Sequence, residues 1–150
     1  MAVRAILWDV DGTLLDFSAA EKAAIQKLFA EFALGECTDE MVARYSVISG
    51  GYWKKLERSH LGEWMDGVFL SEKLGAVKPS PAFFEKVFAA LGDVPKADML
   101  IVGDSLTSDM AGGLMAGIPT CWYNPDRQPR PADMAIDHEI TDLHQIFDLL

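Results

Sequence analysis

The chain has 150 residues, which suits one compact domain, and 50% of them are hydrophobic, as is ordinary for a globular protein. Its 23 acidic and 13 basic residues give a formal net charge of −10. That charge argues against nonspecific binding to nucleic acids or to anionic membrane surfaces, because both require clustered Lys and Arg.

Hydrophobic periodicity, caps and breakers predict strands that alternate with helices. In chain order we expect a strand at 3–10, helices at 19–34 and 38–58, a strand at 67–71, a helix at 81–91, a strand at 99–103, a helix at 108–116, strands at 118–123 and 135–140, and a C-terminal helix capped by Thr141-Asp142. The first helix is predicted from the capping box Ser18-Ala-Ala-Glu21 and from Gly35, which ends it. The alternation is typical of an α/β fold with a mostly parallel sheet.

Two carboxylates follow the first predicted strand. Asp9 lies at its carboxyl end, where ligands bind in open α/β sheets, and Asp11 lies on a turn that Gly12 permits. Two such carboxylates repel each other, and Mg²⁺ prefers carboxylate oxygens together with water and phosphate. The backbone N–H groups of Gly12 and Thr13 are suited to binding phosphate oxygens. Acidic turns are also common, so this stretch alone leaves a purely structural turn open.

A second acidic pair follows the predicted strand at 99–103. Asp104 comes directly after Gly103, again at the carboxyl edge of the sheet, and Asp109 falls in the first turn of the next helix. A carboxylate there is favoured by the helix dipole, so Asp109 is either a functional residue or a helix-stabilising one, with Ser108 as the cap.

Lys78-Pro79 lies between the strand predicted at 67–71 and the helix predicted at 81–91. Proline disfavours a helical conformation for the residue before it, so Lys78 should be extended. Such a lysine could contact a phosphate or a carboxylate, although taken in isolation a surface lysine is the simpler interpretation.

The combination is more specific than its parts. The chain resembles the haloacid dehalogenase (HAD) superfamily in three motifs, namely Asp9-Val-Asp-Gly-Thr-Leu-Leu15 as the first, Lys78-Pro79 as the third, and Gly103-Asp104 with Asp109 as the fourth. Within the superfamily it is similar to the pyrimidine 5′-nucleotidase branch through three segments, 71–79, 103–109 and 116–125. The resemblance implies a three-layer α/β/α Rossmann-like core with a helical cap inserted after the first motif.

The resemblance also implies a mechanism. Asp9 would attack phosphorus to form an aspartyl-phosphate, and Asp11 would act first as general acid and then as general base. Mg²⁺ would be bound by Asp9, the backbone carbonyl of Asp11 and Asp104. Asp109 would be a further ligand or would orient bound waters. Lys78 would stabilise negative charge on the nucleophile and the phosphoryl oxygens.

One motif of the family is absent. Its second motif is a Ser or Thr at the end of a separate strand, but a helix reaching Arg58 leaves only residues 59–66 for that strand and its crossover. A dozen or more residues are normally needed. This indicates an internal deletion near Arg58-Ser59, natural or engineered. Ser59 is a conceivable substitute for the lost hydroxyl, and a chance match is the alternative. The expected core is then 1–17 with 59–150, and 18–58 is a cap remnant.

Losing that strand would leave one edge of the Asp9 strand unpaired. Three outcomes are open. The strand at 67–71 moves into the gap, or a second copy of the chain donates a strand in a homo-oligomer. In the third outcome the protein is only marginally stable.

The leading hypothesis is a Mg²⁺-dependent phosphohydrolase whose partner is a small phosphorylated metabolite, nucleoside monophosphates among them. The alternative is a catalytically impaired relic or interaction module that keeps the metal site. A phospho-accepting receiver domain fits less well, because such domains place the acidic neighbours after the first strand and the acceptor Asp after a later one.

The remaining signals are weak. Cys37 and Cys121 form no CxxC pair, so we expect reduced buried thiols. Trp122 follows a strand at the catalytic edge, so it is expected either in the core or at the pocket entrance. Residues 5–8 are too short for a secretory signal core, and no apolar run approaches the roughly 20 residues of a membrane span, so we expect a cytoplasmic protein.

Overall fold

The structure is a computed structural model that describes residues 3–14, 17–32, 35–42 and 65–150. The chain divides into two compact units: the larger joins residues 1–15 to 71–150, and the smaller comprises 16–70. The assignment of 18–58 to a cap remnant stays a prediction. None of the described helices is long and apolar enough to cross a membrane.

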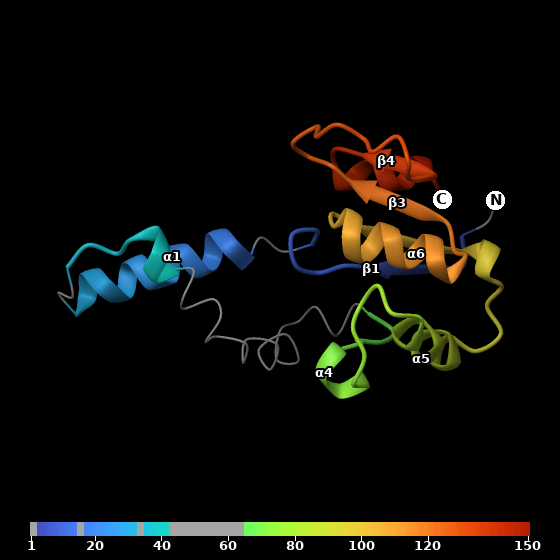
Figure 1. Ribbon diagram of the computed structural model, residues 1–150, viewed down its shortest axis with the longest axis horizontal. Coiled ribbons are helices and arrows are strands. Elements are labelled where there is room, and N and C mark those ends of the chain that lie inside the picture. Colours follow the sequence, from blue (N-terminus) through green and yellow to red (C-terminus); the bar gives the residue numbers. More distant parts are fainter. Residues whose placement is uncertain (1–2, 15–16, 33–34, 43–64) are drawn as a thin grey trace. The chain divides into compact units, whose positions relative to one another are not determined.

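The larger unit contains a sheet of four parallel strands in the order β1-β2-β3-β4 (Figure 1). The strands are β1 Ala5–Trp8, β2 Met99–Gly103, β3 Thr120–Tyr123 and β4 His138–Ile140. The predicted α/β fold class with a mostly parallel sheet is confirmed. The continuous apolar run of β2 is explained by its central position, because all five of its residues are buried.

The helical segments of this unit include the expected ones and two that were not predicted, at 71–74 and 96–98. They are α4 Ser71–Leu74, α5 Pro81–Leu91, η2 Lys96–Asp98, η3 Leu106–Met110, α6 Ala111–Ala116 and η4 Leu143–Asp148. Proline at the first position of α5 is tolerated because that N–H has no partner within the helix. Asp142 caps η4 as predicted, in a capping box with Gln145, although η4 is a 3₁₀ helix.

Alternate residues of β2 serve the two faces of the sheet. Leu100 and Val102 pack in a cluster with Ile146 of η4. On the other face, a Cβ at Gly113 of α6 would lie 2.5 Å from Cγ2 of Ile101, so only glycine lets the helix lie this close to the strand. The unit therefore has three layers, as expected.

The strands predicted at 3–10, 118–123 and 135–140 are shorter in the structure, and two further predicted elements differ in type or starting point. The strand expected at 67–71 is wrong: residues 67–70 form no strand, Ser71 begins α4, and Val68 is 46% exposed. A short apolar run becomes a strand only where a neighbouring edge pairs with it, which the sequence cannot reveal. The helix expected at 108–116 begins earlier, with the π-helical turn η3, because the Ser105 carbonyl accepts from both Asp109 N and Met110 N.

The smaller unit contains α1 Phe17–Glu31, which starts slightly before the predicted residue 19. Gly35 has φ +91°, but α1 ends at Glu31, four residues earlier, so Gly35 does not directly end that helix as predicted. Thr38 precedes the next helix, and its Oγ1 accepts from Met41 N. An exposed ion pair joins Lys22 Nζ to Asp39 Oδ1 at 2.8 Å. The remainder of the helix expected at 38–58, the proposed junction near Arg58 and the candidate substitute Ser59 lie outside the described residues.

Strand β1 has one sheet partner among the described residues. It pairs with β2 from Ala5↔Met99 to Trp8↔Val102, and all four of its apolar residues are only half-buried. The predicted closure of 67–71 against this strand is also wrong, since 67–70 form no strand.

Candidate active site

Adjacent parallel strands place two aspartates at the same edge of the sheet. Asp9 directly follows β1, and Asp104 directly follows β2. The backbone N–H of Asp9 donates to the Val102 carbonyl at 2.8 Å, which extends the pairing of the strands to the site itself. This is the carboxyl edge, where open α/β sheets bind ligands.

A third carboxylate joins them from η3. Asp9, Asp104 and Asp109 each offer a carboxylate oxygen, and these three atoms lie within 4.8 Å of one another. The side chain of Asp109 is buried, that of Asp9 is half-buried, and Asp104 is more open to solvent. The structure thus brings together residues 95 and 100 positions from Asp9 in the chain.

Lys78 lies between two of these carboxylates. Its Nζ donates to Asp9 Oδ1 at 2.6 Å and to Asp109 Oδ1 at 2.5 Å. Burial lowers the pKa of Lys78, but the charges and hydrogen bonds of Asp109 and Asp9 outweigh burial, so the pKa is raised and the amine stays protonated. The alternative of a plain surface lysine does not describe this residue.

Burial and two charged neighbours, Lys78 and Asp9, shift the pKa of Asp109. Burial raises its pKa, Lys78 opposes the rise, and the nearby Asp9 carboxylate adds to it, so that the net shift is upward. Its second oxygen, Oδ2, accepts from the backbone N–H of Ser105 at 3.2 Å. A Cβ at Gly103 would lie 2.3 Å from that oxygen, so glycine at 103 makes room for the carboxylate.

The turn after β1 supports Asp104. Gly12 has φ +81°, and a Cβ there would lie 2.7 Å from Asp104 Oδ2. The hydroxyl of Thr13, which is buried, donates to Asp104 Oδ1 at 3.1 Å. Thr13 was expected to bind substrate through its backbone N–H; its side chain is occupied in orienting Asp104.

Asp11 is placed differently from the other predicted acids. It is exposed, on the turn beside Gly12, and its carboxylate is not part of the group formed by Asp9, Asp104 and Asp109. Its proposed role as an acid and base, and that of its backbone carbonyl as a metal ligand, stay predictions.

One contact at the site was missed by sequence reasoning. The indole Nε1 of Trp122 donates to the backbone carbonyl of Asp104 at 2.9 Å, and Trp122 is 3% exposed. The sequence placed Trp122 in a predicted strand, and the structure pairs it directly with Gly103, next to Asp104. The prediction that this aromatic lies in the core is right, but its hydrogen bond has no sequence pattern.

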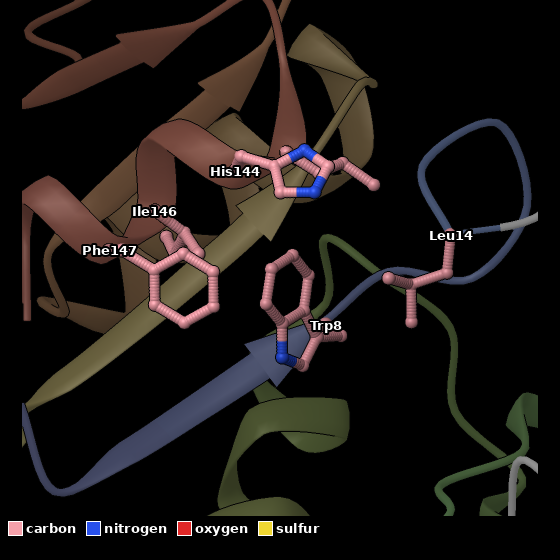
Figure 2. Close-up of a pocket in the computed structure, with 6 residues that line it drawn as sticks. Trp8, Leu14, His144, Ile146 and Phe147 are labelled. Atoms are coloured by element: carbon pink, nitrogen blue, oxygen red, sulfur yellow. The ribbon is translucent and has the colours of Figure 1, made fainter.

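A separate hollow of about 240 Å³ lies on the other side of β1 (Figure 2). Its lining is mostly apolar and consists of Trp8, Leu14, Leu143, His144, Ile146 and Phe147. Figure 2 shows the ring of Trp8 directed towards Phe147 and Ile146 of η4. Because successive side chains of a strand point to opposite faces, this hollow is separate from the carboxylate group next to Asp9.

The carboxylate group fits a divalent cation. Three carboxylates lie close together, and Lys78 bonds to only two of them, so a further positive charge would relieve their repulsion. All three are oxygen donors, the ligand type that Mg²⁺ prefers, and no histidine or cysteine takes part among the described residues.

Comparisons with known proteins agree with this geometry. The family model described as HAD-hydrolase-like matches residues 76–144. YfnB, a HAD-hydrolase of Bacillus subtilis, is 26% identical over 224 aligned residues that cover 98% of this chain and 95% of YfnB. A crystal structure of YfnB bound to magnesium has a TM-score of 0.75 and 27% identity, covering 100% of this chain and 99% of YfnB.

Two further relatives match over a shorter part of their length. The pyrimidine 5′-nucleotidase YjjG of Escherichia coli is 31% identical over 72% of this chain and 50% of YjjG. The glyceraldehyde 3-phosphate phosphatase of Pyrococcus furiosus is 30% identical over 65% of this chain and 42% of that protein. The matched part of the chain thus spans half or less of these two relatives.

The alignment with YfnB also bears on the length of the chain. It runs over 224 positions and nearly from end to end of both proteins, whereas this chain has 150 residues, so at least 74 aligned positions have no residue here. With the parallel sheet, the aspartates at its carboxyl edge and the relatives in agreement, the chain belongs to the haloacid dehalogenase-like (HAD-like) hydrolase enzymes.

Proposed function

We propose that this chain is a Mg²⁺-dependent phosphohydrolase that acts on small phosphate monoesters through an aspartyl-phosphate on Asp9. The observation that carries the proposal is the convergence of the Asp9, Asp104 and Asp109 carboxylates, with Lys78 bonded to Asp9 and Asp109. Phosphoryl transfer depends mainly on positioning and on neutralising charge, and this group supplies both.

In the first step an oxygen of Asp9 forms a bond to phosphorus while the bond to the leaving alcohol breaks. Lys78 donates to Oδ1 of Asp9, which leaves the lone pairs of Oδ2 for the attack. Asp11, on the exposed turn, gives its proton to the leaving oxygen. In the second step Asp11 takes a proton from water, whose oxygen attacks phosphorus and releases Asp9 and inorganic phosphate.

Bound Mg²⁺ would supply charge neutralisation at the phosphoryl oxygens. We propose that the carboxylates of Asp9, Asp104 and Asp109 hold it, with the Asp11 carbonyl as a further ligand. Lys78 stabilises the negative charge of the Asp9 carboxylate, and the N–H groups of Gly12 and Thr13 bind phosphate oxygens.

We propose a broader class of substrate than the names of the two matched phosphatases give. One relative acts on pyrimidine nucleotides and the other on glyceraldehyde 3-phosphate, although both match this chain at about the same identity. Nucleoside monophosphates are therefore one candidate among small phosphate esters. At least 74 positions of YfnB have no counterpart, and we propose that they include the second motif and most of the cap, which would leave the site open and turnover slow.

The second candidate function is a HAD-like relic that binds Mg²⁺ without turnover. It is favoured by the missing positions and by the half-buried state of β1, which carries the nucleophile. In either case we expect the protein to act in the cytoplasm, a prediction from the sequence alone.

One assay separates the two functions. Hydrolysis of an aryl phosphate would be measured for wild type and Asp9→Asn, each with Mg²⁺ and with EDTA. The phosphohydrolase proposal requires that wild type alone be active and only with Mg²⁺. Equal inactivity of two folded proteins would establish the relic instead.

A further inference from the structure

One peptide group at the site is bonded on both of its sides. The carbonyl of Asp104 accepts from Trp122 Nε1 at 2.9 Å, and the next N–H, that of Ser105, donates to Asp109 Oδ2 at 3.2 Å. The carbonyl and that N–H belong to one planar unit, so they turn together. Trp122 is thereby connected with two of the three converging carboxylates.

We propose that Trp122 is a positioning residue for the divalent-cation site, acting through the Asp104–Ser105 peptide. The inference rests on the proposed function, because it assumes that Asp104 and Asp109 bind the cation. It assigns to the indole N–H a role that neither the motifs nor the family match provides.

The indole is suited to this role because it is fixed. Trp122 is 3% exposed in β3, and its backbone pairs with Gly103 at the end of β2. An indole N–H is only a donor, and a buried donor without an acceptor is costly. The hydrogen bond to the Asp104 carbonyl therefore restrains the turn as firmly as the sheet restrains Trp122.

Thr13 and Lys78 bond to the Asp104 and Asp109 carboxylates themselves, whereas the hydrogen bonds made by Ser105 maintain the internal shape of the turn. The Ser105 carbonyl accepts from Asp109 N and Met110 N, and Ser105 Oγ accepts from Ser108 N. These bonds connect near neighbours in the chain, whereas the bond from Trp122 spans 18 residues and attaches the turn to the adjacent strand. Without it, the Asp104–Ser105 peptide can rotate, and both carboxylates move with it.

The test compares Trp122→Phe with Trp8→Phe. Both changes remove an indole and keep an aromatic ring, but Trp8 makes no hydrogen bond through its indole to any described residue. Binding of Mn²⁺, as a probe for Mg²⁺, would be measured by electron paramagnetic resonance on proteins shown by circular dichroism to be folded. Groups that orient metal ligands typically change affinity by 10–100-fold, so we expect Trp122→Phe to weaken binding by roughly tenfold and Trp8→Phe by less than about twofold.

The outcomes distinguish the two proposals. If wild type does not bind Mn²⁺, the proposed function fails together with the inference. If wild type binds Mn²⁺ and Trp122→Phe binds equally well, the role of Trp122 is wrong while the cation site stands. Equal weakening in both variants also overturns it, because loss of an indole without a hydrogen bond to the turn would then have the same effect.

A measurement on wild type covers the case in which Trp122→Phe does not fold. With ¹⁵N-labelled indoles, the Trp122 Nε1–H resonance is assigned by elimination from Trp→Phe variants of the other three tryptophans. We expect this resonance to shift as Mg²⁺ is added, since its acceptor carbonyl belongs to a cation ligand. An unchanged resonance at saturating Mg²⁺, with binding verified by Mn²⁺ competition, contradicts the inference.

Discussion

Strands β1 and β2 each deliver an aspartate to the same sheet edge, but they differ in how the protein surrounds them. All five residues of β2 are buried between two neighbouring strands, whereas the four residues of β1 are half-buried and pair with β2 alone among the described residues. Asp9, the proposed nucleophile, therefore follows the less buried strand. The three carboxylates lie together although β1 has a single strand neighbour among the described residues, because they come from the ends of β1 and β2 and from η3.

The largest expected effect is on phosphatase activity, and it distinguishes the roles of Asp9 and Asp104. Asp9→Asn removes the nucleophile, and phosphatase activity should fall by roughly four orders of magnitude or more. Asp104→Asn should instead raise the Mg²⁺ concentration needed for half-maximal activity, with part of the rate recovered at high Mg²⁺. Titrating activity with Mg²⁺ for both variants checks this, and recovery of Asp9→Asn at high Mg²⁺ would contradict the assignment of Asp9.

Thiol reactivity extends the comparison to β3 and to the smaller unit. Burial raises the pKa of Cys121 from its usual 9.0 to about 12. At pH 8.5 its thiolate should be roughly a thousandfold scarcer than for an ordinary cysteine, and its reaction rate should rise with pH up to that pKa. With Ellman's reagent we expect Cys37, which is only partly buried, to react quickly and Cys121 to react on unfolding. Two fast thiols in the native protein would show that the β3 core opens readily.

Removing Lys78 should affect stability and activity together. Lys78→Met leaves Asp109, whose side chain is 1% exposed, without its cationic partner, and breaking such a pair costs about 3 kcal/mol or more. Adding Asp109→Asn should restore part of that loss, because the buried charge is then also removed. Urea unfolding measures both. Lys86→Met, at a lysine bonded to the Leu74 carbonyl on the surface, is the matched control and should change stability little.

Matched leucine substitutions test how much of β1 is covered. Leu100→Ala in β2 removes a side chain that is 2% exposed and should cost about 3 kcal/mol of unfolding free energy. Leu7→Ala in β1, where the side chain is half-buried, should cost about half as much. Equal losses in urea unfolding would mean that the outer side of β1 is buried by something beyond the described residues.

The smallest expected effect is the pattern of hydrogen-exchange protection along β1 and β2. In a strand with a single neighbour, every second N–H points away from that neighbour, so hydrogen exchange should show alternating protection along β1 and continuous protection along β2. Protection of every β1 amide that increases with protein concentration would instead support the predicted strand exchange with a second copy. Sedimentation at the same concentrations would then give the oligomeric state.

Much of the site follows from sequence alone because its rules are local. The apolar run at 99–103 gave the bounds of β2, while β1 ends at Trp8, two residues before the predicted end. The carboxyl ends of parallel strands meet at one edge, which predicts that Asp9 and Asp104 are neighbours. Gly117, with φ +70°, ends α6 where expected, since few other residues adopt that conformation.

What only the tertiary structure decided depends on contacts between distant residues. Residues 67–71 have a strand-like composition, but 67–70 pair with no described strand, and a strand needs such a partner. The π-helical turn at η3 and the bond from Trp122 to the Asp104 carbonyl result from how the strand ends pack. Residue types and spacing thus determined which groups make up the site, whereas packing determined how firmly each is positioned, because hydrogen bonds across the sheet have no local sequence signal.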